Sequence, residues 1–285
     1  MSRRPVVAAL VAAATAGGLS ALRRALPEDV RAPWERTNHA GDTVTLLEGP
    51  ILAIAAAAGA VAGGSPAAPG VVASLGSAAF GALDDLAGDS ASKGLKGHLG
   101  ALARGEVTTG AIKIVGIGAT GLAAAALADR RTRGAAAGLR AGGSPAPGLM
   151  ATLVGGAAVA GAANLANLFD LRPGRTLKVT VMAGLTALLP PGATGAATAA
   201  AALGAAAGTL PDDLAGRSML GDTGANAAGA LIGLAIVERT GLRGRLAVLA
   251  VTAGLTVLSE KVSFSKVIEG NDVLRRLDAL GRPQR

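Results

Sequence analysis

The sequence has no cysteine, no tyrosine and very few other aromatic residues: one tryptophan and three phenylalanines in 285 residues. The absence of cysteine excludes disulfides, thiolate metal sites and cysteine nucleophiles. Soluble cores normally take much of their bulk from aromatic and large aliphatic side chains, so this chain is poorly suited to a soluble core. Charge is also scarce, at 16% of residues, against roughly 25% in an average globular protein.

What the chain has in excess is small and apolar. Hydrophobic residues make up 51% of it, and 43 of its 285 residues are glycine. Disordered chains have the opposite composition, because they are poor in apolar residues and rich in charge. The glycines have no three-residue period, which excludes collagen. The sequence therefore predicts an all-α fold: a polytopic integral membrane bundle of small-residue helices, forming a single domain over residues 1–285.

Apolar stretches predict about nine transmembrane helices, since a span needs about 20 mostly apolar residues. Two stretches, 49–83 and 179–211, are each too long for one helix and have a Pro/Gly-rich break near the centre. Because proline and glycine terminate helices, each stretch predicts a helical hairpin across the bilayer. The five single spans are expected at 5–22, 109–128, 147–169, 223–237 and 245–259.

Basic residues are unequally divided between the two sides of such a bundle. One set of segments carries 17 Lys and Arg residues, the other set 8, and Lys113 and Arg245 lie at or inside span ends. The positive-inside rule makes the first set cytoplasmic. This predicts a multi-pass protein of the cell (plasma) membrane with a cytoplasmic C-terminus, and it explains the net charge of +8 without a nucleic-acid partner. The cytoplasmic segments are 23–48, 84–108, 170–178, 211–222 and the tail 260–285.

Acidic residues gather at the cytoplasmic ends of three predicted spans. Asp84 and Asp85 end the third span, Asp170 follows the fifth, and Asp222 opens the eighth. Ionisable groups at a membrane edge are costly and are often functional. For Asp222 alone, an ordinary helix N-cap explains the residue equally well. For the adjacent pair that explanation is weaker because like charges repel. Three acidic spots on one face favour a shared site for a hard cation such as Mg²⁺.

Polar and basic residues accompany these acids. Asn164, Asn167 and Asp170 are spaced i, i+3, which places all three on one face of a helix. Such a stripe can coordinate a metal or read a nucleobase edge, and it can also line a polar interface between helices. Lys93 and Lys96 follow the aspartate pair. Acids for a metal and bases for phosphate oxygens are the groups that phosphoryl transfer needs, although each base is also a topological signal.

Four of these segments, in order and on one membrane side, resemble a known family. They are RTNHAGDTV at 36–44, FGALDDLAGD at 80–89, NLANLFD at 164–170 and MLGDTGAN at 219–226. The chain resembles, over nearly its whole length, the polyprenyl-phosphate N-acetylhexosamine-1-phosphate transferases, which include the MraY and WecA-like enzymes. The resemblance implies transfer of a sugar 1-phosphate from a UDP-sugar to a polyprenyl phosphate, with release of UMP, in cell-envelope glycan assembly. It also implies a requirement for Mg²⁺, with Mn²⁺ as an alternative.

The resemblance implies a role for each candidate residue. Asp84 would deprotonate or orient the lipid phosphate, and Asp85 would support it or the metal. Asp222 would bind Mg²⁺ with help from Asn167. The expected substrate-binding residues are Asn164 and Asp170 near the nucleotide, Lys93 or Lys96 at the phosphates, and Asn38 in the first motif. The partners would be the UDP-sugar and the lipid, and a homodimer is compatible with the family.

The chain also departs from the family. Pro173 stands where the family has a second aspartate, and the histidine motif of the last cytoplasmic loop is missing. These departures leave the sugar open. They keep a catalytically degenerate relative, acting as a scaffold for envelope assembly, as one alternative. A membrane transporter or channel is the other, although a transporter more often has repeats and polar groups near the middle of the membrane.

Overall fold

The computed structural model describes residues 3–37, 41–64, 67–87, 100, 104–105, 108–138, 148–189 and 194–283. Within these ranges the fold is all-α, as the composition predicts, apart from one antiparallel hairpin of β1 (Glu35–Thr37) and β2 (Thr43–Thr45). Five segments of the described chain are long and apolar enough to cross a membrane, which indicates a multi-pass membrane protein. They are Arg3–Ala25, Ala68–Ala87, Thr109–Arg130, Leu149–Phe169 and Leu242–Ser259.

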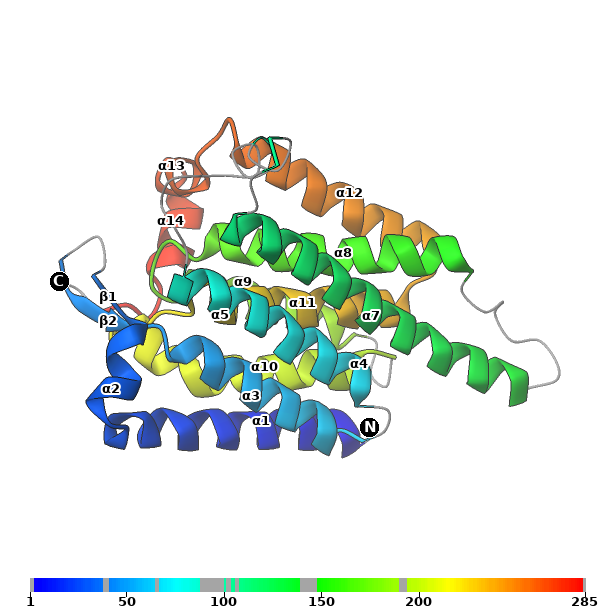
Figure 1. Ribbon diagram of the computed structural model, residues 1–285, viewed down its shortest axis with the longest axis horizontal. Helices are drawn as coiled ribbons and strands as arrows, with labels where there is room; N and C mark the ends of the chain where they lie inside the picture. Colours follow the sequence, from blue (N-terminus) through cyan, green and yellow to red (C-terminus); the bar gives the residue numbers. More distant parts are fainter. Residues whose placement is uncertain are drawn as a thin grey trace.

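The long helices run side by side (Figure 1). In chain order they are α1 (Arg3–Leu22), α3 (Glu48–Ala62), α5 (Ser77–Ala87), α7 (Thr109–Gly138), α8 (Leu149–Phe169), α9 (Arg175–Ala187), α10 (Ala196–Leu214), α11 (Gly221–Arg239) and α12 (Leu242–Ser259). Shorter helices connect or follow them: α2 (Glu28–Arg31), α4 (Ala68–Val71), α13 (Phe264–Glu269) and α14 (Asp272–Ala279). A π-helical turn joins α4 to α5 at Val72–Gly76.

Helix α11 is the centre of the bundle. Most of its residues are buried, and it contacts α3, α5, α8, α9 and α10. The buried core consists largely of alanine, with a few larger side chains such as Leu220, Leu231 and Leu234. Membrane helices gain little from hydrophobic burial against one another, so small residues that let backbones approach closely are what hold them together. The Ala/Gly-rich composition therefore builds a tight bundle around α11.

The Pro/Gly breaks fall where the sequence predicts them, but two helices, α7 and α10, extend past their predicted ends. α3 ends at Ala62 and α9 at Ala187, so both apolar stretches are divided into two helices. α7, however, runs to Gly138, well past the expected end at 128, because the residues that follow are rich in alanine and arginine, which are good helix formers. α10 likewise continues through Pro211 to Leu214.

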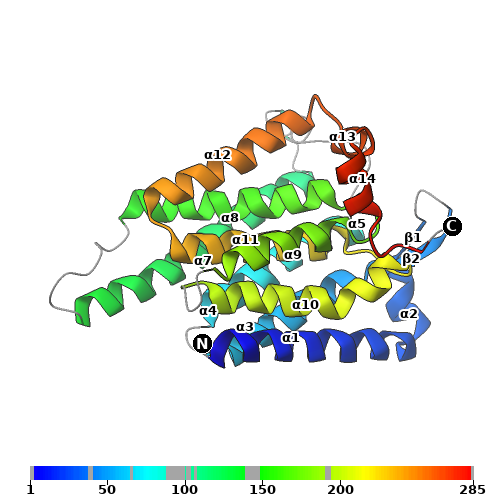
Figure 2. The same cartoon turned by 180° about the vertical axis from the view of Figure 1, so that it is seen from behind.

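One end of the bundle carries most of the irregular structure. The β1–β2 hairpin, α13 and α14 lie there together with the C-terminus, whereas the N-terminus lies at the opposite end (Figure 1). Seen from behind, α14 crosses the direction of the long helices (Figure 2). The loops that bear the sequence motifs therefore converge at this end.

Candidate active site

Three helices bring their charged side chains together at this end. Asp84 lies in the last turn of α5, Lys113 near the start of α7, and Asp222 is the second residue of α11. The Lys113 Nζ donates to Asp84 Oδ2 at 2.7 Å and also to Asp222 Oδ2. The Lys113, Asp84 and Asp222 side chains are 17%, 20% and 22% exposed. A single ammonium thus bridges two carboxylates from different helices in a partly dehydrated position.

Asp85 has different partners from its neighbour. Its Oδ1 accepts from the Asp222 backbone N–H at 3.0 Å, and its Oδ2 accepts from the Thr223 N–H at 2.9 Å and hydroxyl at 2.6 Å. These N–H groups belong to the first turn of α11, which lacks helical acceptors and carries the positive end of the helix dipole. Asp85 therefore caps α11 from another helix. The residue at the N-cap position is Leu220, so the interpretation of Asp222 as an N-cap is wrong.

Two glycines make this arrangement sterically feasible. A Cβ on Gly81 would collide with the backbone carbonyl of Asp222, so α5 and α11 touch there backbone to backbone. Gly221 has φ +60°, a conformation that favours glycine, and a Cβ on it would lie 2.8 Å from an Asp85 carboxylate oxygen. The glycines in the FGALDDLAGD and MLGDTGAN segments are thus what lets the aspartates meet.

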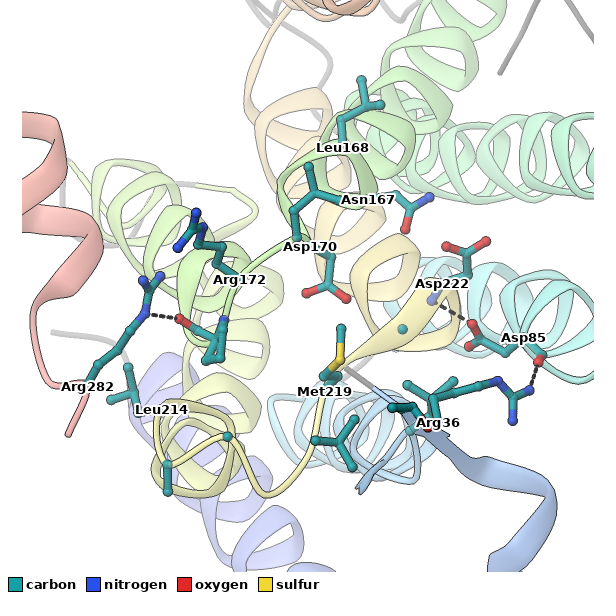
Figure 3. A pocket seen from close by; sticks show the side chains of 18 of the residues that line it. Arg36, Asp85, Asn167, Leu168, Asp170, Arg172, Leu214, Met219, Asp222 and Arg282 are labelled. Carbon is teal, nitrogen blue, oxygen red and sulfur yellow. Dashed lines mark hydrogen bonds between the residues drawn. The ribbon is translucent and has the colours of Figure 1, made fainter. Parts of the chain in front are cut away.

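A cavity of about 1200 Å³ opens beside this cluster (Figure 3). Acidic and basic residues both line it, with Arg36 beside Asp85 and Arg172 and Arg282 together across the cavity (Figure 3), so it can receive a cation and an anion together. The acidic and polar lining residues are Asp84, Asp85, Asn167, Asp170 and Asp222. The basic lining residues are Arg36 of β1, Arg172 of the α8–α9 loop and Arg282 near the C-terminus.

The predicted asparagine–aspartate stripe is only partly brought to the cavity. α8 ends at Phe169, so Asp170 follows the helix and is not part of its face. Burial, followed by the negative charge of Asp213, raises the pKa of Asp170 well above its usual value. Asn167 lines the cavity beside it. The Asn164 amide instead donates to the Thr256 hydroxyl of α12 at 3.0 Å, which is the interhelical contact that the sequence left open.

Three of the expected substrate-binding residues, Asn38, Lys93 and Lys96, lie outside the described residues. Arg36, the first residue of the RTNHAGDTV segment at 36–44, nevertheless lines the cavity. The Arg36 guanidinium donates to the Asp85 backbone carbonyl and so connects the β-hairpin to α5.

Sequence reasoning missed the role of Lys113, although a signal was present. It is the sole charged residue in the apolar run 108–128. An ionisable residue inside a membrane span is by default a functional candidate whose partner should be sought. Its position at a span end left it outside the counts of topological charges, and its two carboxylate partners are far away in the sequence.

The C-terminal segment 264–283, called the C-terminal strap below, was also missed: its last residues, Arg282 and Pro283, line the cavity. Asp278 accepts from Arg175 Nε at 2.8 Å and pairs with Arg282 at 3.0 Å. The Arg282 Nε also donates to the Pro173 carbonyl at 2.7 Å. Pro173 and Arg282 both line the cavity, so an arginine from the strap approaches the cavity at Pro173.

The residues present fit a hard divalent cation. Among the described residues no group of three or more His, Asp or Glu side chains lies close enough to hold a metal. Asp84 and Asp222 nevertheless direct carboxylate oxygens to one point, where the Lys113 ammonium lies, and Asn167 lines the same cavity. Mg²⁺ is commonly held by one or two carboxylates together with substrate phosphates and water. This pair would therefore hold Mg²⁺ in that manner.

Comparison with known proteins assigns no family: no protein-family model matches the chain, and no curated protein matches it. Function is therefore inferred from the residues around the cavity and from the motifs that supply them.

Proposed function

We propose that this protein transfers a sugar 1-phosphate from a UDP-sugar to a polyprenyl phosphate, as a short member of the polyprenyl-phosphate N-acetylhexosamine-1-phosphate transferases. One observation carries the proposal. Asp84 and Asp222 come from two separate motifs, yet they share the Lys113 ammonium at the wall of a large cavity. Paired carboxylates beside a cavity with basic residues are the groups that phosphoryl transfer uses.

The reaction joins an oxygen of the lipid phosphate to the phosphorus that bears the sugar. The bond from that phosphorus to the UMP oxygen breaks, and UMP leaves with the electron pair. Asp222, Asn167 and Asp84 would hold Mg²⁺, and Asp84 would also orient the lipid phosphate or take its proton. When bound, Mg²⁺ neutralises charge on the diphosphate. Asp85 acts indirectly, because its hydrogen bonds to the first turn of α11 fix the position of Asp222.

The arginines that line the cavity, Arg36, Arg172 and Arg282, support an anionic substrate. Guanidinium groups bind phosphate oxygens well because their planar donors match phosphate geometry. Asp170 also lines the cavity and would contact the nucleotide. Asn164 is better explained as a helix–helix contact, given its hydrogen bond to Thr256.

We also propose nine spans, with the site and C-terminus on the cytoplasmic face of the plasma membrane. The five candidate spans include α1, α5, α7, α8 and α12. Helices α3, α9, α10 and α11 complete the nine. The segments richest in Lys and Arg then lie at the end that carries the cavity, which agrees with the positive-inside rule.

The test is product formation by the purified protein with Mg²⁺, polyprenyl phosphate and a panel of UDP-sugars, followed by mass spectrometry of the lipid. One sugar is expected to give a lipid-linked sugar diphosphate. Asp84→Asn is expected to lower the rate of product formation by about 10²–10⁴-fold, as for loss of a general base. The matched control, Arg243→Gln at the far end of the bundle, is expected to keep the wild-type rate. The absence of product with every sugar would overturn the proposal.

A further inference from the structure

The Lys113 ammonium occupies the position between the two carboxylates to which the proposed function assigns a divalent cation. It reaches Asp84 Oδ2 at 2.7 Å and contacts Asp222 Oδ2. Both carboxylates line the cavity, whereas Lys113 approaches them from α7. All three side chains are mostly shielded from water, so their charges interact more strongly than exposed charges would.

Charge balance shows what this arrangement does to cation binding. Two carboxylates alone carry two negative charges, which match one divalent cation. With the ammonium between them the cluster carries a single net negative charge. A divalent cation entering it leaves an excess positive charge in a partly dehydrated site, which is unfavourable until an anion neutralises it. The diphosphate of the proposed substrate is such an anion.

We propose that Lys113 is a built-in counter-ion that makes divalent-cation binding at Asp84 and Asp222 depend on an anionic substrate. Without substrate, the ammonium neutralises the carboxylate pair and keeps cation affinity low. With a nucleoside diphosphate in the cavity, the added negative charge restores the balance and the cation binds. This inference rests on the cation site of the proposed function. It assigns Lys113 a positioning and regulatory role and does not place it in contact with substrate.

The arrangement also explains why a lysine is tolerated in an apolar helix start. A lone ammonium there would be costly, but two carboxylates from α5 and α11 neutralise it. The same ion pairs join α5, α7 and α11 when no cation is present. Without the ammonium the two neighbouring carboxylates would repel each other. Lys113 therefore also stabilises the substrate-free protein.

The test measures Mn²⁺ binding to the purified full-length protein by electron paramagnetic resonance, with and without UDP. Wild type is expected to bind Mn²⁺ weakly alone and about tenfold or more tightly with UDP, which is the size of a typical coupling between sites. Lys113→Met is expected to bind Mn²⁺ about tenfold more tightly than wild type without UDP, since one opposing charge is gone. The UDP effect should then shrink to about threefold or less.

Four variants make the result specific. Lys261→Met removes another lysine at the same end, exposed just after α12, and it should behave as wild type. Lys113→Arg keeps the charge and should not gain affinity. Asp222→Asn measures the Mn²⁺ bound by UDP in solution alone. Lys113→Gln serves as a second neutral variant if Lys113→Met is not monodisperse in detergent.

Equal Mn²⁺ affinity in wild type and in both neutral variants would overturn the inference, and so would the absence of Mn²⁺ binding in all of them. Neither result depends on catalysis. If no UDP-sugar gives product but Lys113→Met binds Mn²⁺ more tightly, the proposed reaction fails and the counter-ion role of Lys113 stands.

Discussion

Asp84 and Asp85 are neighbours in the sequence, yet they do different work. Asp84 pairs with Lys113, while Asp85 accepts three hydrogen bonds from the start of α11. Adjacent residues on a helix point in different directions, so each meets a different partner helix. The sequence could place an acidic pair at the end of a span. It could not assign the two roles, because these depend on α7 and α11.

Replacing each aspartate by alanine should separate the roles. Asp85→Ala should lower the free energy of unfolding by about 1–2 kcal/mol, as for loss of a helix cap. Asp84→Ala should change stability less, because Lys113 keeps Asp222 as a partner, but it should abolish product formation. Unfolding in detergent and turnover would be measured on both. Equal stability of the two variants would contradict the capping role of Asp85.

Asp170 should give the protein a pH-dependent stability. Burial and the charge of Asp213 raise its pKa in the folded state, so the folded protein holds a proton that the unfolded chain has released. The stability from this group is present below its unfolded pKa of about 3.9 and is lost as pH rises through the folded pKa. Asp170→Asn should therefore be more stable than wild type at neutral pH. The difference in melting temperature should shrink toward pH 5; a constant difference would contradict this account.

A buried ion pair lies at the opposite end of the bundle. Arg245 and Asp129 are 3% and 1% exposed and lie 2.6 Å apart, and the Thr152 hydroxyl also donates to Asp129. Arg245 additionally donates to the backbone carbonyls of Ala151 and Val237. Arg245→Met should cost about 3–5 kcal/mol because it leaves Asp129 buried and uncompensated. Adding Asp129→Leu should recover part of the loss in unfolding experiments; a further loss would contradict this explanation.

At the scale of helices, the breaks between helices were predictable, but the side-chain contacts between distant helices were not. The breaks after α3 and α9 were predictable because proline and glycine end helices whatever their tertiary contacts. The end of α7 was missed because good helix formers continue past the last apolar residue. The contact of α14 with α9 depends on Arg175 meeting Asp278, two residues far apart with no periodic signal between them.

The C-terminal strap should control substrate affinity more than chemistry. Although burial acts to raise it, hydrogen bonds and charge from Arg175 and Arg282 hold the pKa of Asp278 below its usual value, so the strap stays attached at neutral pH. Asp278→Asn weakens both contacts and should release Arg282 from the cavity wall. KM for the UDP-sugar should then rise several-fold, about the effect of one weakened ionic contact, with kcat little changed. A fall in kcat at constant KM would contradict this role.

At the scale of the whole molecule, composition alone predicted the class. Few aromatics, few charges and abundant small residues exclude a soluble core and indicate close-packed membrane helices. The gathering of the acids at one end of the bundle was also predictable from span ends. The cavity and its arginines were not, because they come from helices α5, α8 and α11 meeting the hairpin and the strap.

The absence of cysteine makes the proposed topology directly testable. Single cysteines at Lys261 and Gly241, which are exposed near opposite ends of α12, would be the only thiols in the protein. In intact cells a membrane-impermeant maleimide should label Gly241→Cys, whereas Lys261→Cys should react only after permeabilisation. Labelling of Lys261→Cys from outside would contradict a cytoplasmic site.

The most direct test of the central claim is UMP release by the purified protein with the reactive UDP-sugar and Mg²⁺. The account predicts one UMP per lipid-linked sugar, strict dependence on added polyprenyl phosphate, and a loss of about 10²–10⁴-fold in Asp222→Asn, comparable to removing a catalytic group. UMP release that is independent of the lipid phosphate, or that is unchanged in Asp222→Asn, would contradict it.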